Sequence, residues 1–283
     1  MKWFNAAKCV CFHNFKKWTS NYRVWMIAIL TVIFIHYFTD EIRLFTDSTG
    51  LLIAPWIFPF LFGQKYVKLI FFLPLILLFC DAPFIDSNQP YMIARSGRTA
   101  WSVGQIAYIF FASGAYFLFL FISTIVINLP HMEFTMGWGK AIGTLSNTTA
   151  SAQLGIKILF SSRITHYFTP LQAVWFTLLL SWLVGFVLGL LIYAVNSLSG
   201  TRSIGMLAAA FLLVLDATVF ATPQALWFSP VSWCSIGRID IGGMTDYPPI
   251  WYIYLMLGLL IVVLSVFAIW INRKQNIEIL PPI

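Results

Sequence analysis

Residues 171–195 read LQAVWFTLLLSWLVGFVLGLLIYAV, 25 positions without a charged side chain. An α-helix of this length rises about 37 Å, which exceeds the roughly 30 Å of a bilayer's hydrocarbon core. Two further runs share this property, Ile106–Leu129 with 24 residues and Ile250–Ile271 with 22. These stretches predict helices that span a lipid bilayer, and they indicate an all-α polytopic membrane protein.

The composition supports the same fold class. Of 283 residues, 60% are hydrophobic and 10% are charged, and the mean hydropathy is +0.84. A soluble domain carries about 25% charged residues, so lipid is the expected solvent for much of this chain. The formal net charge of +7 does not indicate nucleic-acid binding. The sequence has no nucleic-acid motif, and positive charge accumulates at the cytoplasmic ends of membrane spans.

Three less regular segments complete the predicted spans. Val24–Phe38 is apolar but short, and Ser203–Thr222 contains one acid, Asp216. The region 51–83 holds two apolar runs of twelve residues, and prolines in the first run, 51–62, favour a broken or re-entrant entry. We therefore predict one crossing in that region and six transmembrane helices in the chain.

We predict a single transmembrane domain over residues 1–283. Residues 1–22 mix aromatic and lysine side chains, a pattern typical of an amphipathic helix that lies in the plane of the interface. Spans one to four then occupy 24–195, with a cytoplasmic loop at 84–105. Spans five and six occupy 196–283.

Two longer segments are expected on the outer side. Residues 130–170 form a loop with a polar middle. Residues 223–249, which precede the last span, hold aromatic side chains among four prolines and three glycines. Aromatics in that position suit either an interfacial belt or short re-entrant helices.

The orientation follows from the basic residues. With the N-terminus inside, ten of the seventeen Lys and Arg residues fall on short segments close to span ends, as the positive-inside rule requires. Six spans then place both termini in the cytoplasm. The ten residues are Lys2, Lys8, Lys16, Lys17, Arg23, Arg95, Arg98, Arg202, Arg273 and Lys274.

No catalytic motif is present. The sequence lacks the P-loop pattern, the HExxH pattern and the GxSxG pattern, and its four histidines never occur at metal-ligand spacing. We therefore expect no catalytic residue, no metal site and no cofactor in this chain.

The loop after the second span carries the most informative stretch, YMIARSGRTAW at 91–101. It resembles the first cytoplasmic loop of type-2 ABC exporter permeases, the membrane subunits of ATP-driven exporters. In that family an Arg–small–Gly/Ser–Arg segment followed by an aromatic forms a coupling helix that docks on a separate ATPase subunit. The in-plane helix, the six spans, Asp216 late in span five and FSPVSW at 228–233 follow the family's order over nearly the whole chain. The outer loop at 130–170 is longer than that of compact members.

The resemblance implies a bacterial plasma-membrane permease subunit with an outer re-entrant segment before its last helix. Its implied partners are ABC ATPase subunits, which carry the ATP and Mg, and a second copy or a paralogous permease. Arg95 and Arg98 are three apart, so we predict that they share a helical face and pair with acidic groups on the ATPase. Trp101 is predicted to anchor that interface. The predicted ATPase-coupling residues are Tyr91, Arg95, Ser96, Gly97, Arg98 and Trp101.

Three residues within the spans are further candidates. Asp216 is an isolated acid in a span, and such groups face a cavity or a partner helix. It is expected to line the translocation path, to hold a dimer together, or to make a structural hydrogen bond. Gly185 and Gly189 are four apart, a spacing that lets helices pack closely.

The leading hypothesis is a permease that exports a peptide, an antibiotic or another amphipathic substrate and performs no chemistry itself. An ion-coupled secondary carrier is one alternative, although no internal repeat is apparent and Asp216 is the one acid within a span. A membrane-embedded lipid-modifying enzyme is a second alternative, although the spans carry few polar residues. A sensor or immunity partner would dock an ATPase in the same way, so the sequence does not separate it from an exporter.

Overall fold

A computed structural model describes residues 2–84, 89–201, 203–218, 222–243 and 245–274. These residues form helices and no strand. The α-helices are α1 (Lys2–Lys16), α2 (Tyr22–Thr49), α3 (Phe58–Leu61), α4 (Lys65–Phe79), α5 (Gln89–Ser96), α6 (Arg98–Asn128), α7 (Gly139–Asn147), α8 (Ala150–Gln153), α9 (Ser162–Tyr167), α10 (Pro170–Ser199), α11 (Ile204–Thr218) and α12 (Ile250–Lys274). Short 3₁₀ helices are η1 (Lys17–Thr19), η2 (Leu129–His131), η3 (Ala225–Phe228), η4 (Ser232–Cys234) and η5 (Ile236–Arg238).

Four helices in the described part are long and apolar enough to cross a membrane, namely α2, α6, α10 and α12. The all-α membrane class predicted from the sequence is thereby confirmed. Helices α4 and α11 have fifteen residues each, about 22 Å of rise, which is less than the hydrocarbon core of a bilayer. The fifth predicted span ended at Thr222, and its residues 219–221 lie outside the described residues.

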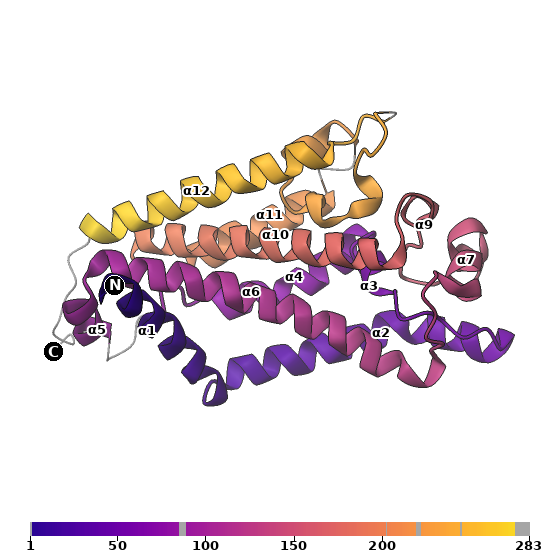
Figure 1. The fold of residues 1–283 in the computed structure, drawn as a ribbon, viewed down its shortest axis with the longest axis horizontal. Helices are drawn as coiled ribbons and strands as arrows, with labels where there is room; N and C mark the ends of the chain where they lie inside the picture. Colours follow the sequence, from indigo (N-terminus) through magenta and orange to yellow (C-terminus); the bar gives the residue numbers. More distant parts are fainter. Residues whose placement is uncertain (1, 85–88, 202, 219–221, 244, 275–283) are drawn as a thin grey trace.

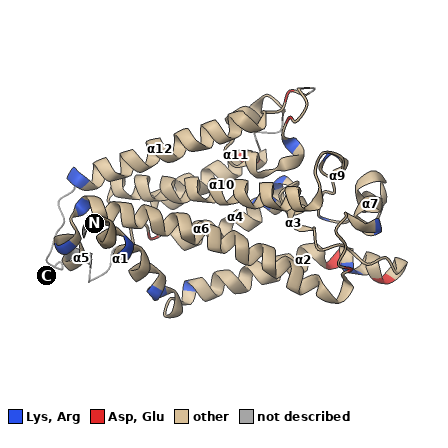
Figure 2. Ribbon diagram, viewed as in Figure 1, with Lys and Arg blue, Asp and Glu red and all other residues tan. Residues whose placement is uncertain are grey.

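The long helices run along one axis of the molecule, and the start of α1 and the end of α12, the first and last described segments, lie at the same end of the bundle (Figure 1). The acidic residues are distributed unevenly between the two ends. Lys and Arg lie at both ends, whereas most of the acidic residues drawn lie at the end opposite the described termini (Figure 2). We call these the terminal end and the far end. Arg202, one of the ten basic residues that fixed the predicted orientation, lies outside the described residues.

Helix α10 is the central element of the bundle, packed against α6, α11 and α12. Local sequence fixes both of its ends. The Thr169 backbone N–H donates to Oε1 of Gln172 at 3.1 Å in a capping box, and Pro170 occupies the first turn. At the other end Gly200 adopts the left-handed conformation with φ 69°. The predicted span Leu171–Val195 therefore lies within the helix.

The first long helix extends beyond its apolar run at both ends. The fifteen apolar residues at Val24–Phe38 are too few to cross the hydrocarbon core, so adjoining turns were expected to complete the crossing, and α2 has 28 residues. Asn21 caps its start by accepting the N–H of Arg23, and Gly50 ends it with φ 68°. The charged residues after 38 end the apolar run without ending the helix, because charged side chains on an exposed turn are compatible with helical backbone. Turns on both sides of the apolar run therefore lengthen the helix, as the shortness of that run requires.

Asn196 joins three helices near the terminal end. Its Nδ2 donates to the carbonyl oxygens of Cys80 and Ala82 at 3.1 and 2.8 Å, beyond the end of α4. Its Oδ1 accepts the N–H of Gly205, in the first turn of α11, at 2.8 Å. This single side chain on α10 thus fixes the ends of two neighbouring helices.

Candidate functional sites

The predicted coupling stretch forms two helices. Tyr91, Arg95 and Ser96 lie on α5, whereas Arg98 and Trp101 lie in the first turn of α6. Gly97 separates the helices with φ 80° and ψ 151°, a conformation that side-chain-bearing residues rarely adopt. Residues 85–88 of the predicted loop 84–105 lie outside the described residues.

The prediction that Arg95 and Arg98 share a helical face is therefore wrong. Helical spacing places residues i and i+3 together only within a continuous helix, and Gly97 interrupts it. Arg95 is exposed on α5. Arg98 instead donates from Nη1 to the carbonyl oxygen of Arg273 at 2.8 Å, where it fastens the end of α12 to the start of α6.

The aromatic residues of the stretch differ in exposure. Tyr91 is 73% exposed, but Trp101 is 3% exposed. The expectation that Trp101 anchors an interface with a partner is corrected accordingly, because its ring already lies inside this chain. Tyr91 and Arg95 are the predicted coupling side chains that remain most open to a partner at this end.

Helix α1 packs against α6 and lies beside α5 at the terminal end. Its buried residues recur at helical spacing, Ala7, Val10, Cys11 and Asn14. Asn14 donates to Oε1 of Gln105 on α6 at 2.6 Å. A hollow between α1 and α5 is lined by Ala6, Cys9, Val10, Met92, Arg95 and Ser96.

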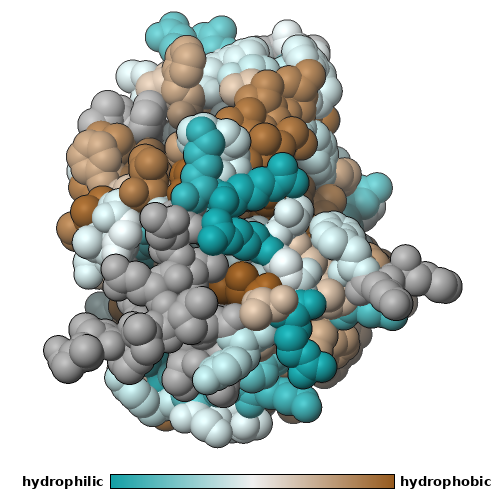
Figure 3. Space-filling view, turned by 90° about the vertical axis from the view of Figure 1, so that its left-hand side faces the viewer, coloured by the Kyte–Doolittle hydropathy of each residue, from teal (hydrophilic) through white to brown (hydrophobic). Residues whose placement is uncertain are grey.

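The surface of the terminal end shows a group of hydrophilic side chains near its centre, with apolar side chains next to them (Figure 3).

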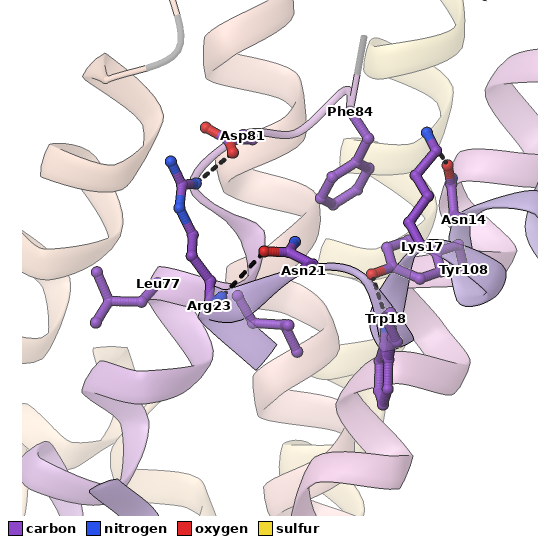
Figure 4. Close-up of a pocket in the computed structure, with 10 residues that line it drawn as sticks. Asn14, Lys17, Trp18, Asn21, Arg23, Leu77, Asp81, Phe84 and Tyr108 are labelled. Carbon is purple, nitrogen blue, oxygen red and sulfur yellow. Dashed lines mark hydrogen bonds and ion pairs between the residues drawn. The ribbon is translucent and has the colours of Figure 1, made fainter. Parts of the chain in front are cut away.

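A second hollow lies at the turn from α1 into α2 (Figure 4). Trp18 donates from Nε1 to the Tyr108 hydroxyl of α6 at 2.8 Å, which closes one wall. On the opposite wall Arg23 forms an ion pair with Asp81. The two contacts tie the start of α2 to α6 and to the segment after α4. The basic and acidic groups here are thus engaged with one another.

The strongest electrostatic feature of the described bundle lies toward the far end. Lys68 in the first turn of α4 places Nζ 2.6 Å from Oδ2 of Asp216, which lies in the last turn of α11. The side chains are 1% and 3% exposed. The contact is an ion pair and not an aligned hydrogen bond, because Nζ meets no acceptor at hydrogen-bond geometry in the described structure. Two opposite charges are therefore removed from solvent together.

Two serines complete this charge cluster, which comprises Lys68, Asp216, Ser229 and Ser232. Ser229 donates from its hydroxyl to Oδ1 of Asp216 at 2.5 Å, and Ser232 donates to the same oxygen. Both serines belong to the segment between α11 and α12. That segment is further held by Ser235, whose hydroxyl donates to the Phe62 carbonyl at 2.5 Å. The cluster thus binds two short helices and this connecting segment into one unit.

Sequence reasoning identified Asp216 but missed its partners. Lys68 lay in a polar stretch between two apolar runs and was interpreted as part of a connection. A signal was present, because a lone acid within a span requires a counter-charge and Lys68 directly precedes an apolar run. Of the roles considered for Asp216, the structure shows hydrogen bonds and an ion pair within one chain.

The predicted re-entrant segment consists, in its described part, of the three short 3₁₀ helices η3, η4 and η5. Trp233 and Ile236 are buried, and Trp233 donates from Nε1 to the Leu226 carbonyl at 2.9 Å. The Trp227 carbonyl accepts from the Tyr252 hydroxyl at 3.1 Å, which attaches the segment to α12. The segment is therefore packed against the bundle.

The glycine pair lies where three helices meet. A Cβ on Gly185 would approach Cδ2 of Leu75 and Cε2 of Phe117 to 2.7 Å. A Cβ on Gly189 would overlap Ile109 of α6 and Phe79 of α4. Close packing at Gly185 and Gly189 is thus confirmed, and the packing occurs within one chain.

The loop at 130–170, which the sequence places on the outer side, is attached to α2 by Lys157. Its ammonium forms an ion pair with Glu41 and lies 3.7 Å from the centre of the Tyr37 ring. The hydrogen bond with Glu41 raises the pKa of Lys157, so this lysine stays charged at neutral pH. The loop is therefore tethered to the first long helix.

Among the residues described, no three His, Cys, Asp or Glu side chains gather at a point where they could hold a metal ion. Comparison of the chain with protein-family models, with curated proteins and with solved structures finds no match.

Proposed function

We propose that the chain is the membrane-spanning permease subunit of an ATP-driven exporter of the type-2 ABC class. In this proposal six helices cross the bilayer, namely α2, α4, α6, α10, α11 and α12, and both termini are cytoplasmic. In this proposal α3 completes the short helix α4. The segment 223–249 enters the membrane from the outer side.

The observation that carries the proposal is the position of α5. This eight-residue helix lies at the terminal end, between α4 and α6 in the chain, and exposes Tyr91 and Arg95. It is joined to α6 through the single residue Gly97. A partner that moves α5 would therefore act on the first turn of a 31-residue helix.

The contacts of α6 support transmission of such a movement. Its first turn binds the end of α12 through Arg98. The following turns bind α1 through Gln105, and they bind Trp18 of η1, just before α2, through Tyr108. A rigid-body push on α5 would thus be distributed to several helices at once. Altered access driven by nucleotide binding in a partner is a population shift of this kind.

A second permease subunit, either another copy or a paralogue, is placed against α11 in this proposal. The helix presents Leu207, Phe211 and Val214 at helical spacing, 62%, 62% and 50% exposed. The path would lie between the two subunits. A peptide, an antibiotic or another amphipathic molecule is the proposed cargo.

An ion-coupled carrier is less well supported. Such a carrier uses an intramembrane acid to bind its ion. Here both carboxylate oxygens of Asp216 already contact Lys68, Ser229 or Ser232. The acid is therefore occupied by groups of its own chain.

The test is co-purification from the native membrane in mild detergent, with the tagged chain read by mass spectrometry. We expect a soluble P-loop ATPase in comparable amount with the wild-type chain. Arg95→Glu should lower its recovery at least tenfold, because the reversed charge would face acidic groups of the partner. Lys140→Glu is the matched control, since it makes the same charge change on exposed α7.

Arg98 is left unchanged in this test because its contact with the Arg273 carbonyl is structural. Recovery of no ATPase by the wild-type chain after cross-linking would overturn the proposed function. Equal recovery with Arg95→Glu and with the wild type would overturn the docking role of α5.

A further inference from the structure

The far end of the bundle has a cleft formed by parts of the chain that are distant in sequence. Its residues come from the start of α4, from α8 and the loop that follows it, and from η5. The wall is apolar, with Ile156, Ile158 and Leu159. Lys65 and Arg238 line the same cleft.

No acid in the described part of the chain pairs with either cation of this cleft. Lys65 and Arg238 are each half-buried, and neither has an ion pair with any described acid. The one contact of the Lys65 ammonium described is with the Tyr66 ring, 5.1 Å from its centre. The nearest acid in sequence to Arg238 is Asp240, whose carboxylate accepts from Gly243 and Thr245 in its own loop.

The start of α4 adds to the uncompensated positive charge. The first turn contains Lys65 and Lys68 and no acid, and Gln64 makes no side-chain cap. The amino end of a helix already carries partial positive charge, so lysines there are unfavourable without an anion nearby. Asp216 neutralises Lys68. The positive charges of Lys65 and Arg238 are not neutralised by any described acid.

An apolar stripe leads away from the cleft along α4. Tyr66 lines the cleft and is 55% exposed, and Leu73 is 39% exposed two turns further on. Leu69, Ile70 and Leu77 lie along the same stripe and are half-buried. An anion that also carried acyl chains would satisfy the cations and cover this stripe together.

We propose that this cleft binds an anionic phospholipid, with its phosphate between Lys65 and Arg238 and an acyl chain along the stripe of α4. This inference requires only that the chain lies in a bilayer, and it goes beyond the proposed export function. Charge selects the headgroup, and the apolar wall distinguishes a lipid from a dissolved anion. The lipid would thereby join the outer loop to α4 next to the charge cluster.

The test is lipid binding by the full-length purified chain, read by native mass spectrometry. The probes are phosphatidylglycerol, phosphatidylcholine of the same acyl chains, and glycerol phosphate without acyl chains. We expect phosphatidylglycerol to be retained in preference to phosphatidylcholine, and millimolar glycerol phosphate not to displace it. Lys65→Gln and Arg238→Gln should each weaken phosphatidylglycerol binding about tenfold, the effect of losing one charge-assisted hydrogen bond.

Two variants complete the design. Lys140→Gln removes an exposed lysine of α7 that does not line the cleft, and it should leave binding unchanged. Leu159→Asp places a negative charge on the cleft wall at a 49% exposed position, where folding should tolerate it, and it should also weaken binding. Equal binding of both lipids, unchanged binding in the cleft variants, or displacement by glycerol phosphate would each overturn the proposal. ATPase co-purification is a separate readout, so the two proposals fail independently.

Discussion

Removal of the negative charge at Asp216 is the most informative single perturbation of this protein. Asp216→Asn preserves the size of the side chain and its ability to accept from Ser229 and Ser232. It also leaves the ammonium of Lys68, 1% exposed, without a counter-charge. The variant therefore isolates the electrostatic part of the charge cluster.

The magnitude follows from the geometry. At 2.6 Å, with an effective dielectric constant of about 20, the attraction between the two charges is about 6 kcal/mol. Desolvation of both ions offsets most of this, so replacing the pair by neutral groups costs little. Removing one partner alone costs about 3–5 kcal/mol, because the other charge stays buried. We expect this loss for Asp216→Asn, and recovery of at least half of it when Lys68→Met is added.

The measurement is a double-mutant cycle on the free energy of unfolding in detergent, obtained by titration with a denaturing detergent. Asp246→Asn is the matched control, because its side chain is exposed at the same end, and its effect should stay within about 0.5 kcal/mol. The reasoning is refuted if Asp216→Asn costs less than about 1 kcal/mol, or if Lys68→Met adds its full cost to that of Asp216→Asn.

Three further substitutions test other contacts. Gly189→Ala should destabilise the chain by about 1–3 kcal/mol, because the added methyl group overlaps α4 and α6. Gly258→Ala, whose methyl group would meet open space, should not destabilise it. The measurement is thermal unfolding of both variants in detergent. Asn196→Ala should cost about 2–3 kcal/mol because it leaves buried backbone groups unpaired, measured in the same way. At Gly97 a Cβ would meet no other atom, but the positive φ should cost Gly97→Ala about 1–3 kcal/mol of backbone strain and so perturb the junction between α5 and α6. We expect this variant to express normally and to recover less ATPase, and unchanged ATPase recovery would contradict the prediction.

The apolar runs of the sequence predicted α6, α10 and α12 well. A helix that is long and apolar enough to lie in lipid is recognised by its length and hydrophobicity, and both can be read directly from the sequence. The apolar run located the first long helix but not its bounds, because the helix continues through Asp40 and Glu41. They mark only the end of the apolar run. Helix ends depend on capping, here by Asn21 and Gly50, which lie outside that run.

The candidate sites were less predictable because they depend on contacts between distant segments. The partner of Asp216 could be sought among the few lysines and arginines next to apolar runs, but its identity needed the packing of α4 against α11. Whether residues 91–101 form one helix or two depends on the backbone conformation of Gly97. A glycine in a helical pattern is a known warning of a break, yet only the backbone shows that α5 and α6 are separate helices.

The charge cluster also constrains the order of events during synthesis. Lys68 precedes Asp216 by 148 residues (216 − 68), so at about 5–20 residues per second α4 exists for roughly 7–30 s before its counter-ion is made. Over that interval an unpaired lysine near the end of a short apolar helix opposes stable insertion. In the six-span arrangement proposed above, α4 would therefore reach stable membrane integration only when α11 arrives, and a ribosome stalled between the two should leave α4 extractable from the membrane.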